Sequence, residues 1–531
     1  MPHNATHMPM ETLNKSFSNT LALNITTNSS QKQKCFSSQN HPDDVRDRSV
    51  TKPVSERGCA PIELLPMEIF DQIIPHLAID TPSNGYAPRN KDLASCLLVS
   101  RAFHCATLST LYANVTFPHS TIFSKFLAHI SRYPDLGELV KRLDFSHFTS
   151  VGLGRTRRMN YEIQKLTATT LRKCLDLNPN LREFFASEAL DDDMDQKVLE
   201  KLFCDLPRLN AVDFCAASSA VFVSGFLNAV SPNNPLLPEV MPIKRLGLHG
   251  CTTLPPSIFA TLLPRLSNLT HLDLTHTQIT DGTLHAIPQT ARLTHLSLSK
   301  CNRLKGPAVV DFLINHPSTQ GLIHLNLLYD TGRYRLLTSA DVDELLPELP
   351  LTLRSLNISG AKINFTHVPQ LRRLAKQLEE LSIGNADLSV ENMNSILQQG
   401  DGLEGPGNDT TSRSTLRYLD LTGISSITPS SLIDTTGCSL LTQASYPLRV
   451  IEVGEKIIEG LKDRPKSSKR LGWAIKSQHR RSWYIREKSE IPDDDDGSRS
   501  WKMGGKWWGG RKVGMGQAEI SGIYGYYGFG K

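Results

Sequence analysis

Long apolar runs are missing from this chain. No stretch of its 531 residues approaches the ~18 consecutive apolar residues that a membrane-spanning helix requires. The first twenty residues hold no charged segment followed by an apolar one, so we expect no secretory signal. These two absences favour a protein of the cytoplasm, the nucleus or both.

Catalytic and metal-binding motifs are also missing. The ten cysteines are scattered and form no Cys-x-x-Cys pair, which favours reduced thiols over disulfides or a structural zinc site. No Gly-rich phosphate loop precedes a helix pattern, and no Gly-x-Ser-x-Gly elbow occurs. The acidic runs at 191–195 and 493–496 lack the spacing of a calcium loop. We expect a protein that is not an enzyme and that binds no cofactor and no metal.

Tryptophan is absent from most of the chain, since all five tryptophans lie between residues 473 and 508. Residues 462–531 also hold sixteen Lys or Arg and eight Asp or Glu, whereas the rest of the chain is nearly balanced. Interleaved cations and aromatic rings can follow phosphates and stack on bases, so one hypothesis is a nucleic-acid contact through this tail. The alternatives are a cap over the end of a repeat array, followed by a disordered end, or a patch for nuclear import.

Residues 1–58 are rich in Asn, Ser, Thr and Gln and are predicted to be disordered. From Pro61 the pattern changes. Apolar residues recur at helical spacing in PIELLPMEIFDQIIPHL, and DLASCLLV and RAFHCATLSTLY predict two further helices, the last capped by Ser100. Three short helices at 59–117 bury too little to be stable alone, so we expect their apolar surface to meet a partner.

A repeated apolar frame occupies most of the remaining chain. The frame apolar-x-x-apolar-x-apolar recurs ten times between Val140 and Val453, with a weaker copy at Leu181. Each copy predicts a short strand whose alternate apolar residues face inward, followed by a return segment, often helical, that packs behind it. No copy closes its own core, so neighbours must stack. The predicted fold class is therefore an α/β solenoid, extending over residues 118–461.

The residues that flank the inward apolar positions should face the other, concave side of this solenoid. Three histidines in successive repeats are expected to form a stacked ladder, with strands about 4.8 Å apart. The predicted target-binding surface consists of Arg245, His271, Asp273, His295, His324, Asn326, Asn357, Glu380, Tyr418 and Asp420. A solvated face without a partner is the alternative. Parallel side chains from a flat ladder do not converge tetrahedrally, so we expect no zinc there.

Two parts of the chain resemble known families. The segments LPMEI (65–69) and LVSRAF (98–103), with the closing LYANVTF, resemble an F-box in its divergent fungal form. The segments LGLHGC and LSLSKCNRL, with Cys251 and Cys301 at the turn, resemble cysteine-containing leucine-rich repeats. An F-box followed by such repeats is similar to the substrate receptors of SCF (Skp–cullin–F-box) ubiquitin ligases.

The resemblance implies a non-catalytic adaptor. Its helical unit would bind a Skp-type protein of a cullin ligase complex, and its repeats would present a target for ubiquitin transfer and proteasomal degradation. The implied adaptor-binding residues are Leu65, Pro66, Ile69, Ile73, Val99 and Phe103. Two alternatives stay open: these residues only pack the helices onto the first repeat, or the chain is a repeat scaffold without ligase assembly. We interpret Cys251 and Cys301 as small buried groups bonded to the backbone.

Overall fold

The computed structural model describes the helical and repeat regions of the chain. The described residues are 60–78, 90–117, 119–146, 148, 166–329, 335–397, 414–478, 481–487, 511–512 and 527–528. All described elements from Pro61 onward belong to one compact unit, Pro61–Lys531. The segment 1–58, predicted to be disordered, lies outside the described residues. No helix in the described ranges is long and apolar enough to cross a membrane.

This unit begins with helices around a small core. A 3-10 turn, η1 (Pro61–Leu64), precedes α2 (Met67–Ala78), α3 (Asn90–Cys96) and α4 (Arg101–Ala113). Ser100 caps α4, because its hydroxyl oxygen accepts a hydrogen bond of 3.4 Å from the backbone N–H of Phe103. The three predicted helices are confirmed.

Fourteen strands form one sheet, and the first twelve follow chain order and run parallel. These strands are β1 (Asn114–Thr116), β2 (Arg142–Asp144), β3 (Glu183–Ala186), β4 (Ala211–Phe214), β5 (Arg245–Gly247), β6 (His271–Asp273), β7 (His295–Ser297), β8 (His324–Asn326), β9 (Ser355–Asn357), β10 (Glu380–Ser382), β11 (Tyr418–Asp420) and β12 (Val450–Glu452). The register aligns equivalent residues, so that Leu272 pairs with Leu296 and Leu296 with Leu325. Each repeat of the apolar frame therefore contributes one strand, as predicted.

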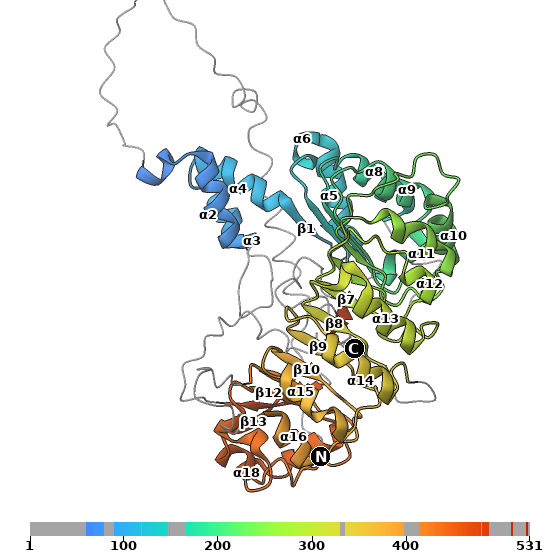
Figure 1. The fold of residues 1–531 in the computed structure, drawn as a ribbon. Helices are drawn as coiled ribbons and strands as arrows, with labels where there is room; N and C mark the ends of the chain where they lie inside the picture. Colours follow the sequence, from blue (N-terminus) through green and yellow to red (C-terminus); the bar gives the residue numbers. More distant parts are fainter. Residues whose placement is uncertain are drawn as a thin grey trace, which may run out of the picture. The chain divides into compact units, whose positions relative to one another are not determined.

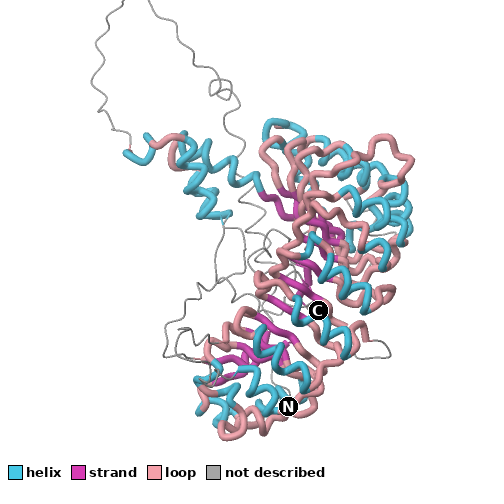
Figure 2. The backbone as a smooth tube through the Cα atoms, in the orientation of Figure 1, coloured by secondary structure: helices cyan, strands magenta, loops and turns pink. Residues whose placement is uncertain are grey.

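Short helices return the chain from one strand to the next and lie along one side of the sheet (Figures 1 and 2). They are α5 (Ser120–Arg132), α6 (Pro134–Gly137), α8 (Ala168–Asp176), α9 (Gln196–Cys204), α10 (Ala220–Ala229), α11 (Pro256–Leu262), α12 (Asp281–Leu284), α13 (Gly306–Asn315), α14 (Ser339–Glu348), α15 (Val368–Leu374), α16 (Val390–Leu397), α17 (Glu455–Lys462) and α18 (Pro465–Arg470). The 3-10 turns η2 (Glu188–Asp193), η3 (Leu263–Arg265), η4 (Pro317–Thr319), η5 (Phe365–His367), η6 (Ser439–Leu441) and η7 (Gln443–Ser445) supplement them. Helices and strand leucines share one buried core from Phe117 to Tyr484. The fold is a leucine-rich-repeat-type α/β solenoid.

A tight turn follows most strands. Four residues after the central apolar residue of the strand, the backbone is left-handed in seven repeats, at Ala216, Gly250, His276, Lys300, Gly360, Asn385 and Gly423. At the next position, the thiols of Cys251 and Cys301 donate to the carbonyl oxygens of Phe214 (2.8 Å) and Leu274 (3.0 Å). Burial raises the pKa of Cys301 to about 11, which keeps it a neutral thiol. The interpretation of both cysteines as buried, backbone-bonded groups is confirmed.

A C-terminal hairpin extends the sheet beyond the predicted repeats. It consists of β13 (Trp473–Gln478) and β14 (Arg481–Arg486), and β14 pairs antiparallel with β12. Its aromatic residues Trp473, Trp483 and Tyr484 are fully buried. A separate two-stranded ladder joins β15 (Arg511–Lys512) to β16 (Tyr527–Gly528). The sheet thus includes β1 and this hairpin, outside the range 118–461; the domain limits 59–117, 118–461 and 462–531 stay predictions.

Candidate protein-interaction surfaces

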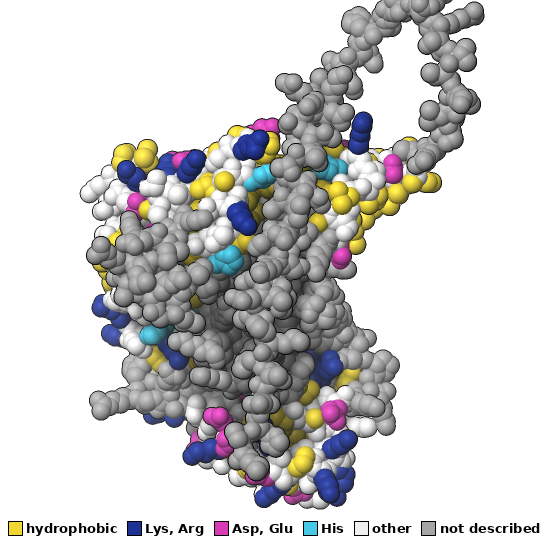
Figure 3. All heavy atoms as spheres, turned by 180° about the vertical axis from the view of Figure 1, so that it is seen from behind, with side chains coloured by type: hydrophobic (Ala, Val, Ile, Leu, Met, Phe, Trp, Pro, Cys, Tyr) yellow, Lys and Arg dark blue, Asp and Glu magenta, His cyan; other side chains and the backbone are white. Residues whose placement is uncertain are grey.

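The first candidate surface lies on the helices between residues 61 and 113, and we call it the helical patch. Among the residues of these helices whose side chains the structure describes, Phe70, Ile74, Leu93 and Ala106 form the buried hydrophobic core. Nine large apolar side chains are consequently more than a third exposed: Ile62, Leu64, Leu65, Met67, Ile69, Ile73, Leu77, Leu98 and Val99. Hydrophobic side chains, yellow in Figure 3, gather on this unit at the upper right of the view.

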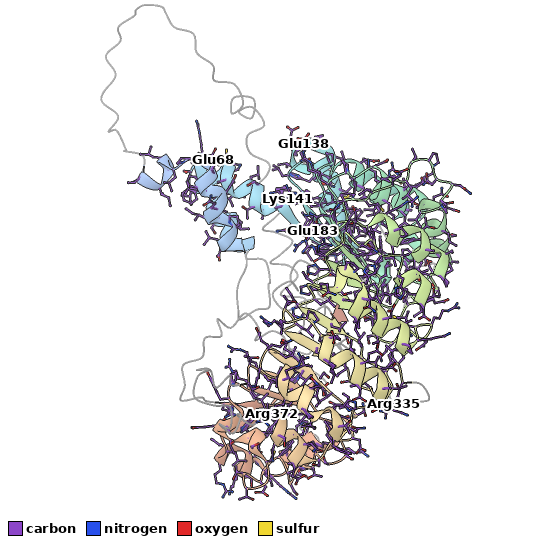
Figure 4. The ribbon with its side chains drawn as sticks, in the orientation of Figure 1. Glu68, Glu138, Lys141, Glu183, Arg335 and Arg372 are labelled. Carbon is purple, nitrogen blue, oxygen red and sulfur yellow. The ribbon has the colours of Figure 1, made fainter. Side chains whose placement is uncertain are left out.

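The structure brings several predicted adaptor-binding residues together. Ile69 and Ile73 are four residues apart on α2 and therefore share one helix face. Leu65 and Pro66, just before α2, and Val99, in the turn after α3, are exposed as well. Glu68 lies on the same helix (Figure 4).

Phe103 differs from the other predicted adaptor-binding residues. Its side chain is half-buried, and its ring meets that of Phe70 edge to face with centroids 5.1 Å apart. It therefore supports the small core. Sequence reasoning missed Leu64 and Leu98, each 73% exposed. The signal was present, because apolar runs at 64–65 and 97–99 exceed what three short helices can bury.

The second candidate surface is the side of the sheet opposite the strand leucines, which we call the polar face. Its first row is the residue before the central apolar residue of each strand, and its second row is the residue after it. His271, His295 and His324 are aligned in the first row by the register. Their rings stack with centroids 4.0 and 4.3 Å apart, so the predicted imidazole ladder is confirmed.

The histidine ladder is buried, with the three side chains at most 9% exposed. Burial, helped by the positive charge of Arg245, lowers the pKa of His271 to about 3. His271 is therefore neutral at physiological pH. Its Nδ1 atom lies 2.9 Å from the hydroxyl oxygen of Thr270, the residue before it.

Arg245, at the start of the ladder, is held by an ion pair. One Nη atom of Arg245 lies 2.5 Å from a carboxylate oxygen of Glu183 on β3, and Arg142 on β2 pairs with the other oxygen. Glu183 and Lys141 occur at the same end of neighbouring strands (Figure 4). The Arg245 charge is thus partly neutralised within the sheet, which reduces its availability to a bound partner.

The second row shapes the turn that follows each strand. The side-chain oxygens of Asp273, Asn326, Asn357 and Asp420 each accept a hydrogen bond from the backbone N–H two residues later, at 2.9, 3.1, 3.0 and 2.9 Å. Asp144 does the same at 2.8 Å. Asp and Asn serve equally well in this bond, because each offers the same oxygen. They differ in charge.

A carboxylate pair lies where the parallel strands end. Burial, followed by the negative charge of Glu452, raises the pKa of Asp420 to about 6. The Tyr418 hydroxyl and the Trp483 Nε1 atom both donate to Glu452, the latter at 3.2 Å. Glu380 on β10 is buried in the first row.

All ten predicted target-binding residues thus occupy one face of one sheet, and their binding role stays a prediction. Across the described ranges, no group of three or more His, Cys, Asp or Glu residues is arranged to hold a metal ion.

Comparison with known proteins adds a relative. No protein-family model matches the chain. Over 276 residues, 48% of the chain, it is 34% identical to the F-box protein YLR352W of Saccharomyces cerevisiae (strain ATCC 204508 / S288c). This chain is a homologue of an F-box protein. The match spans 34% of the yeast protein's length, about a third.

Solved structures show only distant likeness. Rad7 in the yeast complex of Rad7 and Elc1 covers 68% of this chain and 89% of its own, with 17% identity and a TM-score of 0.39. The match to an internalin (InlF) of Listeria monocytogenes covers 55% of this chain and 67% of the internalin chain, with 12% sequence identity and a TM-score of 0.30. The match to the leucine-rich repeat-containing protein LegL7 of Legionella pneumophila covers 54% of this chain and 86% of LegL7, with 17% sequence identity and a TM-score of 0.33.

Proposed function

We propose that this chain is a non-catalytic substrate receptor of an SCF-type ubiquitin ligase. The helical patch binds a Skp-type adaptor, and the polar face of the sheet binds the target protein. The observation that supports this best is the helical patch, where nine large apolar side chains surround a four-residue core. So large an exposed apolar area favours a permanent partner. The homology to an F-box protein supports the same assignment.

The energetics of the helical patch are suited to a helix-in-groove contact. Ile69, Ile73 and Leu77 recur every four residues along α2, the spacing with which an amphipathic helix lies in an apolar groove. Covering one such partly exposed side chain contributes about 0.5–2 kcal/mol. Covering all nine side chains together offsets the roughly 4–15 kcal/mol that association costs in lost translational and rotational freedom.

In this proposal the chain positions the target protein, and the other ligase subunits catalyse ubiquitin transfer. The target is held against the polar face, whose rows repeat every 4.8 Å or so along the sheet. Ubiquitin transfer then occurs on the target without a catalytic residue or cofactor from this chain. Such a receptor works in the cytoplasm, the nucleus or both.

Adaptor recovery tests this function. The double variant Leu98→Asp with Val99→Asp places charge on the helical patch at residues 73% and 62% exposed, so folding is spared. The matched control, Leu351→Asp with Phe365→Asp, makes the same change at residues 76% and 68% exposed on the solenoid. We expect the first variant to retain less than about a tenth of the purified Skp-type adaptor and the control to retain all of it.

A gentler variant, Leu65→Ala with Pro66→Ala, should give an intermediate loss. Equal adaptor recovery by the wild type and by every variant would contradict the assignment. A repeat scaffold without ligase assembly predicts that no version retains the adaptor.

A further inference from the structure

The second row of the polar face carries charge of one sign. Its ionisable members are all acidic: Asp144, Asp213, Asp273, Asp420 and Glu452. Neutral residues occupy the strands β7 to β10 between them. The first row differs, because its cations Arg142 and Arg245 share Glu183. A ligand that follows the second row therefore meets carboxylates at both ends of the sheet and no cation of that row.

Two buried polar atoms on the first row point to an occupant of this face. The Nε2 atom of His271 and the hydroxyl of Ser355 make no hydrogen bond to any residue that the structure describes, although both side chains are at least nine-tenths buried. The His271 Nδ1 atom faces its own strand through Thr270, so Nε2 at the far end of the ring points away from the sheet. Ser355 lies in the same row three strands further on.

The helices cannot satisfy these atoms. Their apolar side chains pack with the strand leucines in the core on the other side of the sheet. Buried polar groups without partners cost free energy, so a segment that brings donors and acceptors to this face is favoured.

The chain contains a segment of complementary charge. Residues 497–531 hold six Lys or Arg and a single Glu, together with seven Trp, Tyr or Phe residues. Of this segment the structure describes the ladder between β15 and β16.

The segment is long enough to reach the row. The hairpin strand β14 ends at Arg486 beside β12. The eleven Cα steps from Arg486 to Gly497 span at most about 36–40 Å when extended. Seven strand steps separate β14 from β6, about 34 Å at 4.8 Å each. Residue 497 can therefore lie at any point of the row between Asp420 and Asp273, and the residues that follow it can continue toward Asp144.

We propose that residues 497–531 bind in cis along the second row of the polar face. Their Lys and Arg side chains lie opposite the carboxylates, and their backbone and aromatic groups cover the histidine ladder. Three cations, Lys141, Lys244 and Arg354, directly precede their strands and lie about three residues, or 10 Å, from the second row. They repel the basic segment and so keep it at the carboxyl ends of the strands. If the polar face also binds the target, as the proposed function holds, the target must displace this segment before it can bind. The regulatory role of the segment therefore rests on the proposed function.

The second row offers a substitution that changes charge alone. In Asp144→Asn with Asp273→Asn and Asp420→Asn, each amide oxygen can keep the turn hydrogen bond, as Asn326 and Asn357 already do. The matched control, Glu344→Gln with Glu348→Gln and Glu459→Gln, removes three charges from exposed positions of α14 and α17.

Hydrogen exchange of the full-length chain, read by mass spectrometry, tests the proposal. We expect backbone amides in 497–531 to be protected in the wild type and in the control. Protection should fall about tenfold in the Asn variant, the effect of three weakened ion pairs, and fall likewise in the wild type at high salt. Unchanged exchange in β7 to β10 shows that the variant is folded.

Three results would overturn the proposal: unprotected amides in the wild type, equal protection in the Asn and control variants, or protection that disappears on dilution, which assigns the contact to a second copy. Adaptor recovery depends on the helical patch and not on this row. The full-length Asn variant should therefore retain the adaptor, so failure of this inference and failure of the receptor function give different results.

Discussion

Replacing Trp473 with alanine should release the C-terminal hairpin from the end of the solenoid. The Trp473 ring is fully buried, and its Nε1 atom donates to the carbonyl oxygen of Leu441 at 3.1 Å. The ring also stacks on Tyr484, with centroids 5.2 Å apart, and the guanidinium of Arg486 lies 4.8 Å from its centroid. Truncation leaves a cavity and an unpaired carbonyl, which together cost about 3–5 kcal/mol.

The loss should stay near the end of the sheet. In a solenoid each repeat is stabilised mainly by its neighbours, and β14 covers the last parallel strand through the pair Ile451 and Tyr484. A cost of about 3–5 kcal/mol corresponds to an opening equilibrium raised roughly 10²- to 5 × 10³-fold, at 1.36 kcal/mol for each factor of ten. Hydrogen exchange of the amides in β12, β13 and β14 should accelerate by that factor. Amides in β5 to β8 should keep their wild-type rates.

Trp473→Phe is the matched control. It keeps an aromatic ring against Tyr484 and loses the indole N–H, so it should cost about 1–2 kcal/mol. An acceleration below about fivefold in β12 for the alanine variant would refute the reasoning, because the hairpin would then contribute little to the end of the sheet. Equal effects of alanine and phenylalanine would show that the hydrogen bond, and not the buried ring, fixes the hairpin.

Three further substitutions test other parts of the sheet. Gly360 has φ of +90°, and an added Cβ collides with the Tyr329 carbonyl oxygen, so Gly360→Ala should lower the free energy of unfolding by about 2 kcal/mol or more in a urea titration. Lys300→Gly, at the equivalent left-handed turn, should be neutral or stabilising by up to about 1 kcal/mol. Folding raises the pKa of Asp420 from 3.8 to about 6, so the folded chain binds the Asp420 proton more tightly than the unfolded chain does. The contribution of Asp420 to the free energy of unfolding therefore falls as the pH rises from about 4 through 6. Asp420→Asn should remove that slope from a plot of urea midpoint against pH, and an unchanged slope would contradict the assignment.

The repeat frame is enough to predict the strands, because an apolar triplet of fixed spacing that recurs so often is typical of stacked repeats. Spacing alone predicts that Leu272, Leu296 and Leu325 lie in neighbouring strands, and the register agrees. The strand at 114–116 was missed because LYANVTF was assigned to the helical unit. A cap over the end of the repeat array was one of the open alternatives, and the hairpin does cover the last parallel strand. Its strands were not predicted, because its basic residues favoured a surface tail, whereas Trp473 and Trp483 are buried. Composition alone does not say which side of a strand its charged residues occupy.

The candidate surfaces show a similar limit. Alternation along a strand predicts which face a side chain occupies, so the histidine ladder could be predicted. Burial and pKa depend on distances that sequence does not contain, such as the 4.0 Å between the His271 and His295 rings. Phe103 illustrates the same point on the helical patch. Its position in the motif suggested a contact residue, and only the structure reveals its packing against Phe70.

The second row separates what the fold requires from what recognition can use. The turn needs a side-chain oxygen two residues before its backbone N–H, and Asp273 and Asn326 meet that need with bonds of 2.9 and 3.1 Å. Because the side-chain oxygen of either Asp or Asn accepts the turn hydrogen bond, that bond does not determine which of the two residues occupies a position in the row. The arrangement of charge, with carboxylates at β2, β6 and β11 and amides at β8 and β9, is therefore not set by folding. A ligand lying along this row meets neutral amides in the middle and negative charge at both ends, so its own cations must be spaced to match.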